Sequence, residues 1–109
     1  MFKKKYRLSA RVYLRQALVI HTLFFTLRIA KSSLPFSRFG FVVSKKIDQR
    51  SVVRNKVKRK VRLCIEELIT RIKGGYDMLF YIKNRAVEDK QMIICKETQR
   101  VFEENKLLI

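Results

Sequence analysis

Six cationic side chains crowd the nine-residue stretch RNKVKRKVR at residues 54–62, with no carboxylate among them. They are Arg54, Lys56, Lys58, Arg59, Lys60 and Arg62. Guanidinium groups present planar forks to phosphate oxygens and ammonium groups act as point charges, so these residues are suited to binding phosphates. Asn55, in the same stretch, can read a base edge or fix a neighbouring side chain. Like charges this close repel one another, so the stretch predicts an external anionic partner.

The residues that usually perform catalysis are sparse. His21 is the only histidine, and the basic part of the chain has neither paired carboxylates nor a glycine-rich loop. Cys64 and Cys95 lack metal-ligand spacing and each stands in an apolar run, so we expect two buried free thiols in a reducing compartment. The sequence therefore predicts neither a catalytic residue nor a metal ligand in this chain.

The net charge of +17 over 109 residues is placed on one side of the sequence. Residues 1–62 hold 18 Lys and Arg against a single acid, Asp48, whereas residues 63–109 hold 8 basic and 8 acidic residues. A one-sided basic field indicates a polyanionic partner and no small-molecule substrate. The apolar run at residues 17–27 is interrupted by polar residues and is too short to span a membrane. We therefore expect a cytoplasmic protein.

The hydrophobic pattern predicts one α+β domain over residues 1–109, with elements in the order αββαβα. Ser9 is expected to cap a helix over residues 10–20 that has Leu14, Ala17 and Leu18 on one face. The other predicted elements are strands at 23–30, 37–44 and 76–82, a long helix at 52–73 ended by a double glycine, and a last helix at 88–106.

The long helix has an apolar stripe of Val53, Val57, Val61, Cys64, Leu68 and Ile72, with the cations on the opposite face. A solvated helix face normally mixes charges, yet residues 49–65 contain no acid. Like-charged pairs three or four residues apart, together with cations in the first turns, cost roughly 1–3 kcal/mol. A face this unfavourable is better explained as a binding surface than as a solvated one.

The stretch SKKIDQRSVVRNKVKRKVR resembles the signature of the bacterial ribonuclease P protein subunit. The matching positions are Ser44, Lys45 and Lys46, followed by Arg54, Asn55, Lys58, Arg59 and Arg62. Weaker matches extend over the whole chain, at Arg7-Leu8, Phe25 and Leu27, Arg38 and Gly40, and Tyr76-Asp77.

The resemblance implies an α-β sandwich of αββαβα or αβββαβα order, of the type shared with ribosomal proteins and domain IV of elongation factor G, with a left-handed βαβ crossover. It also implies an endoribonuclease in which a catalytic RNA removes the 5′ leader of precursor tRNA with Mg²⁺ held mainly by that RNA. The implied RNA-binding residues are Arg7, Arg38, Lys45, Lys46, Arg54, Asn55, Lys56, Lys58, Arg59, Lys60 and Arg62.

The resemblance further implies a cleft for the leader, formed by the first helix and a sheet face. Its expected residues are Tyr13, Leu14, Leu18, Phe24, Thr26 and Arg28. The family usually has aromatic residues where this chain has Leu14 and Leu18, and the connection at residues 19–23 is shorter than usual.

Two other functions compete with this interpretation. A structural RNA-binding protein of the ribosomal type would share the fold, and it would purify with ribosomes instead of one large RNA. A basic protein of membrane surfaces would carry aromatic residues opposite the charges, where the long helix has small β-branched ones.

Overall fold

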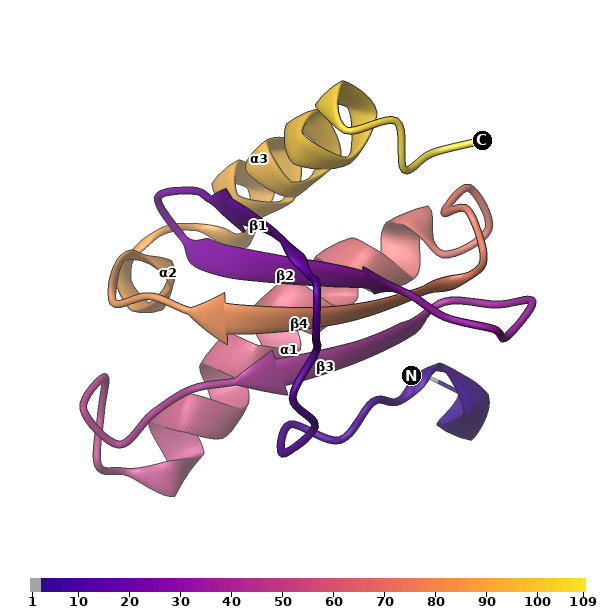
Figure 1. Cartoon of the computed structure of the whole chain (residues 1–109). Coiled ribbons are helices and arrows are strands. Elements are labelled where there is room, and N and C mark those ends of the chain that lie inside the picture. Colours follow the sequence, from indigo (N-terminus) through magenta and orange to yellow (C-terminus); the bar gives the residue numbers. More distant parts are fainter. Residues whose placement is uncertain (1–2) are drawn as a thin grey trace.

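The computed structural model describes residues 3–109, in which a four-stranded sheet lies between two helices on one face and the N-terminal segment on the other (Figure 1). The strands are β1 (Leu18–His21), β2 (Phe25–Lys31), β3 (Arg38–Val42) and β4 (Tyr76–Ile82). The helices are α1 (Ser51–Leu68), α2 (Arg85–Glu88) and α3 (Gln91–Glu104), preceded by a 3-10 turn, η1 (Lys4–Tyr6). The predicted α+β class is confirmed, and both long helices pack behind the sheet in Figure 1.

The sheet has the order β1-β2-β4-β3. β2 pairs antiparallel with β1 and β4, whereas β3 and β4 are parallel and joined through α1. In Figure 1, β3 and β4 both run from right to left, β4 lies above β3, and α1 returns behind them. This path makes the β3-α1-β4 crossover left-handed, as the family resemblance implied, whereas nearly all crossovers between parallel strands are right-handed.

The core lies between the sheet and the helices. Phe25, Leu27 and Ile29 alternate along β2 toward the helices, and the Phe80 ring of β4 stands 5.1 Å from that of Phe25. On α1 the predicted stripe is buried at Val57, Val61, Cys64 and Leu68, and Ile65 is buried beside it. Val53 is half-buried, and Ile72 lies beyond the end of the helix. Burying this stripe holds α1 against the sheet and turns its charged face to solvent.

The helix expected over residues 10–20 is wrong. Ser9 Oγ does accept a hydrogen bond from Arg11 N–H, but the turn that it starts is not continued. Gln16 has a φ of 51°, in the left-handed region, which no helix interior adopts. Beyond it, residues 18–21 form β1 instead, because pairing with β2 gives the β-branched Val19 and Ile20 a place in the sheet.

Other element boundaries shift where distant segments intervene. α1 ends at Leu68 instead of residue 73, because the chain beyond it binds the C-terminus: Lys73 N–H donates to Leu107 O at 2.8 Å. Gly75 then adopts a φ of 90° to enter β4. The last helix, expected at 88–106, begins later: the short helix α2 ends at Glu88, and α3 runs over Gln91–Glu104.

The expectation of two free thiols is also wrong. Cys64 on α1 and Cys95 on α3 form a disulfide with a Cα–Cα distance of 4.9 Å. The two helices pack side by side, and this places the cysteines within bonding distance although 31 positions separate them.

Within residues 3–109, no helix is both long and apolar enough to cross a membrane.

Candidate nucleic-acid interface

The outward face of α1 carries a cluster of cationic side chains. Lys56 and Arg59 are exposed, whereas Lys58 and Arg62 are partly buried. Among residues 3–109, no other residue forms a hydrogen bond or ion pair with any of these four side chains. We call these four residues the α1 cationic face; Asn55 lies exposed beside them. The lack of internal partners leaves their donors available to phosphate oxygens.

The N-terminal segment extends this face into a groove. Leu8 N–H donates to Phe39 O at 2.9 Å, which fastens the segment along the outer edge of β3. A hollow of about 190 Å³ results, and Arg7, Lys58 and Arg62 all contribute to its lining. Its apolar lining comes from Leu8, Ala10, Phe39, Gly40 and Phe41. The fold thus gathers three predicted RNA-binding residues from two distant segments.

Two of the six cations in the 54–62 stretch instead contact the protein's own backbone. The Arg54 guanidinium donates to Asp48 O and Gln49 O at 3.0 and 2.7 Å, which ties the preceding loop to the helix. Lys60 Nζ donates to three carbonyl oxygens around α2, those of residues 86, 87 and 89, at 3.3, 3.1 and 3.2 Å. Both residues therefore have a structural role that the charge pattern did not indicate.

The loop before α1 presents Lys45 and Lys46 to solvent. Asp48, in the same loop, pairs with Arg50 at 2.9 Å. Hydrogen bonds from the Arg50 side chain and backbone lower the pKa of Asp48 to about 2. The carboxylate therefore stays ionised, caps the Arg50 N–H and cancels one charge of the basic region.

Arg38 is also neutralised within the protein. Its guanidinium forms a two-pronged pair with Asp77 across β3 and β4, at 2.9 and 2.8 Å, and this raises the pKa of Arg38. The Asp77 side chain is 13% exposed, so the pair is largely shielded on that side. Arg38 thus joins two parallel strands instead of offering an unpaired cation.

The sheet face opposite α1 and α3 holds part of the expected leader cleft. Thr26 and Arg28 both lie on it, and Thr26 Oγ1 is 3.1 Å from His21 Nδ1. Arg28 donates to Leu14 O at 3.0 Å, and its guanidinium carbon lies 5.5 Å from the centre of the Tyr13 ring. Tyr13 is 75% exposed, so one face of its ring is open to a stacking partner.

Of the other three residues expected in the cleft, Phe24 and Leu18 lie elsewhere, whereas Leu14 is buried on the same sheet face. Phe24 is buried in the main core, because it precedes β2 and does not follow that strand's alternation. Leu14 is buried against Leu79, where the non-helical N-terminal segment covers the sheet. Leu18 pairs with Ile29 and so points to the side of the helices. The placement of Phe24 and Leu18 beside Thr26 and Arg28 is therefore wrong, whereas Leu14 does lie beside Arg28, from which its carbonyl oxygen accepts a hydrogen bond.

Tyr81 was missed by the sequence analysis. It pairs with Thr26 across β2 and β4 and is partly buried on the same open face. Alternation along YDMLFYI, with Met78, Phe80 and Ile82 directed to the core, was the signal that could have found it.

Within residues 3–109, no three His, Cys, Asp or Glu side chains gather where they could hold a metal ion. The candidate interface consists of cationic donors, which repel Mg²⁺.

Comparison with known proteins agrees with these features. The Ribonuclease P family model matches residues 2–106. The ribonuclease P protein component of Fusobacterium nucleatum is 37% identical over 82 residues, covering 72% of this chain and 73% of that protein. The Microcystis aeruginosa protein of the same name is 42% identical over 66 residues, covering 61% of this chain and 55% of that protein. The chain spans about half the length of most of the curated relatives that it matches.

Solved structures share the fold. A Staphylococcus aureus RNase P protein, described as a mutant with defective mRNA degradation activity, aligns with a TM-score of 0.82 at 22% identity, covering 97% of this chain and 92% of that one. The RNase P protein from Thermotoga maritima aligns with a TM-score of 0.73 at 19% identity, covering 83% and 84%. Family model, relatives and fold together lead to one conclusion: this chain belongs to the bacterial ribonuclease P protein family.

Proposed function

We propose that this chain is the protein subunit of a cytoplasmic ribonuclease P ribonucleoprotein. In this role it binds the catalytic RNA and the 5′ leader of precursor tRNA, and assists the endonucleolytic removal of that leader. The observation that carries the proposal is the α1 cationic face, whose four cations have no hydrogen-bond or ion-pair partner within residues 3–109, in a chain that belongs to this family. A cationic face of this kind suits a protein that assists a catalytic RNA better than it suits an enzyme that acts on a small molecule.

The catalytic RNA would contact the α1 cationic face and the groove beside it. Duplex RNA is recognised by its shape and its phosphates more than by base edges, and the α1 cations match that requirement. Lys45 and Lys46 lie exposed in the loop that leads into the helix and would extend the contact. Asn55 can add one base or sugar contact beside the cations.

The leader would lie as a single strand on the open sheet face. Tyr13 offers a ring for stacking, and Arg28 holds that ring through its guanidinium at 5.5 Å. Thr26 and Tyr81 would supply hydroxyl donors beside it. Replacing Tyr13 by Ala should therefore lower the affinity for precursor tRNA relative to mature tRNA, whereas Tyr13→Phe should preserve it. Equal ratios in the two variants would show that the leader lies elsewhere.

Mg²⁺, which the family implies, would stabilise charge at the scissile phosphate when bound, and we propose that the RNA holds it. The residues described above offer no carboxylate cluster for that ion.

Reconstitution with the catalytic RNA of the same organism tests the proposal. Arg59→Ala combined with Arg62→Ala should weaken assembly and lower the slope of log affinity against log salt by about 1.4–1.8, because each lost phosphate contact contributes about 0.7–0.9. Lys90→Ala combined with Lys96→Ala is the matched control, because both side chains are exposed in the neutral half of the chain. An identical loss in both double variants would mean that the α1 cationic face is not the RNA-binding surface.

The competing structural role has a separate outcome. A ribosomal-type RNA binder would sediment with ribosomes and would leave precursor tRNA processing unchanged. Stimulated leader removal at low Mg²⁺ by the wild-type chain, reduced by the double substitution at 59 and 62, supports the ribonuclease P assignment instead.

A further inference from the structure

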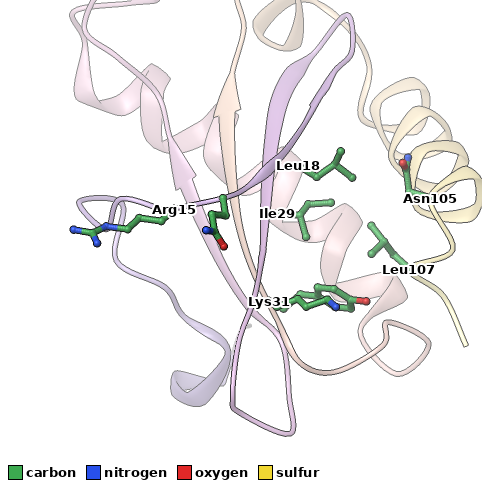
Figure 2. A pocket seen from close by; sticks show the side chains of 8 residues that line it. Arg15, Leu18, Ile29, Lys31, Asn105 and Leu107 are labelled. Carbon is green, nitrogen blue, oxygen red and sulfur yellow. The ribbon is translucent and has the colours of Figure 1, made fainter.

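A pocket of about 400 Å³ lies where β1 begins, and none of its lining residues comes from α1. The residues that line it are Arg15, Gln16, Leu18, Ile29, Lys31, Tyr76, Asn105 and Leu107 (Figure 2). They come from the N-terminal segment, the first residues of β1 and β4, the end of β2 and the chain at the end of α3. The volume falls in the range of pockets that hold small ligands. Neither the RNA face nor the leader face described above uses it.

The floor of the pocket is apolar. Leu18, Ile29 and Leu107 converge on one space in Figure 2. Ile29 and Leu107 are buried, whereas Leu18 is 57% exposed, so part of an apolar wall faces solvent. Tyr76 adds an aromatic ring to the lining. A flat, partly apolar ligand would cover this exposed surface.

An open stretch of strand edge lies beside the floor. β1 begins at Leu18, and by the alternation of an antiparallel ladder the next hydrogen-bonded pair would join Gln16 to Lys31. Gln16 has a φ of 51° and leaves the sheet, and within residues 3–109 no hydrogen bond joins the two backbones. On the other side Ser32 N–H donates to Gly75 O, so the alternation directs the Lys31 N–H and C=O away from β4. The N–H donor and the C=O acceptor of Lys31 are therefore left side by side at the pocket.

The rim of the pocket is cationic and carries amide groups. Arg15 and Lys31 are exposed, and no carboxylate occurs among the described residues that line the pocket. Asn105 Nδ2 donates to Val101 O at 2.8 Å, which leaves its Oδ1 as a free acceptor. Cations beside an apolar floor favour a ligand that has both a phosphate and a flat ring.

We propose that this pocket binds one nucleotide of single-stranded RNA. The base would lie on Leu18 and Leu107, its edge would pair with the Lys31 backbone donor and acceptor, and its phosphate would meet the Arg15 and Lys31 side chains. This proposal rests on the proposed function, because that function identifies RNA as the partner. It adds a specific contact with one nucleotide. Because Leu18 points to the side of the helices, the contact is distinct from the leader face.

An extended peptide is the other class of ligand that could use a free strand edge. Strand addition draws its affinity from several main-chain hydrogen bonds in a row. Here only one hydrogen-bonded pair is open, because β2 ends at Lys31. A peptide without acidic side chains would also leave the Arg15 and Lys31 cations without an anionic partner. The short edge and the charge together favour a nucleotide.

Methyl NMR titration of the whole chain tests the proposal directly. 5′-UMP and 5′-AMP should move the methyl signals of Leu18, Ile29 and Leu107, whereas ribose 5-phosphate, which lacks the base, should leave these signals in place. Leu18→Glu should weaken nucleotide binding by about tenfold or more, because it removes an apolar contact and adds repulsion to phosphate. Leu23→Glu is the matched control: Leu23 is 65% exposed and lies outside the pocket lining.

The outcomes separate this proposal from the proposed function. Unmoved methyl signals with both nucleotides, equal affinity in Leu18→Glu and the control, or a response to an acidic peptide alone would each overturn the nucleotide site. The variant with Arg59→Ala and Arg62→Ala should keep nucleotide binding in the pocket while it loses catalytic RNA. If the nucleotides bind as expected and the wild-type chain fails to bind catalytic RNA, the assembly role fails and the pocket assignment stands.

Discussion

Lys56 and Lys60 lie one helical turn apart on α1, and the structure predicts opposite effects of replacing them. Lys60→Met keeps the apolar stem but removes an ammonium that donates to three backbone carbonyl oxygens around α2. Hydrogen bonds from a charged group contribute about 1.5–3 kcal/mol. Because Lys60 is only partly buried, water can replace some of its donors, so we expect the low end, about 1.5 kcal/mol. Lys56→Met removes an exposed side chain and should be nearly neutral.

Thermal unfolding followed by circular dichroism measures this difference. The entropy of unfolding is about 2.1 cal/mol/K per residue, so for 109 residues a loss of about 1.5 kcal/mol lowers Tm by about 6.5 °C. RNA binding should show the opposite order of effects. Lys56→Met should lower the slope of log affinity against log salt by about 0.7–0.9, and Lys60→Met should leave that slope unchanged. Equal Tm shifts in the two variants would refute the assignment of Lys60 to the fold.

The remaining predictions concern the disulfide and two carboxylates. Reducing the Cys64–Cys95 bond, which closes a loop of 31 positions, should lower the free energy of unfolding by about 3.7 kcal/mol, measured by urea unfolding with and without a thiol reductant; an unchanged midpoint would contradict the cross-link. Asp48 has a pKa lowered to about 2, so its contribution to stability is present above pH 4, roughly its unfolded value, and is lost as pH falls through about 2. Asp48→Asn should remove that part of the loss of stability in acid. Identical profiles of unfolding free energy against pH for the wild type and the variant would argue against the Asp48–Arg50 pair. Asp77→Asn should destabilise the fold by about 1–2 kcal/mol in urea unfolding, since it leaves Arg38 without its partner, whereas the double variant with Arg38→Met should recover part of the loss.

Local patterns in the sequence were sufficient for much of the fold. The predicted strand at 76–82 is β4, because its alternation and the double glycine before it are both local signals. The buried stripe of α1 follows from spacing alone, since a helix with period 3.6 places those residues on one side. The charge asymmetry is a property of the residue order and does not depend on the fold.

The N-terminal segment shows where local patterns fail. Leucines at helical spacing suggested a helix over residues 10–20, yet Leu14 reaches its burial by packing on Leu79, 65 positions away in the chain. Pairing with β2 then recruits residues 18–21 into the sheet. Contacts with distant segments stabilise these conformations more than helix formation would, and a single sequence does not display them.

The candidate site, like the fold, was predictable from the sequence only in part. The sequence by itself determined that one helix carries a dense cationic face without acids, because charge and helical period are both written in the residue order. Only the tertiary structure decided which of the predicted cations remain available: Lys60 contacts α2 and Arg38 pairs with Asp77, whereas Lys58 lines a groove beside the N-terminal segment. It also decided that Cys64 and Cys95 meet. Each of these outcomes depends on the distance between atoms far apart in the chain, and that distance is set when the apolar faces of the helices and the sheet pack together.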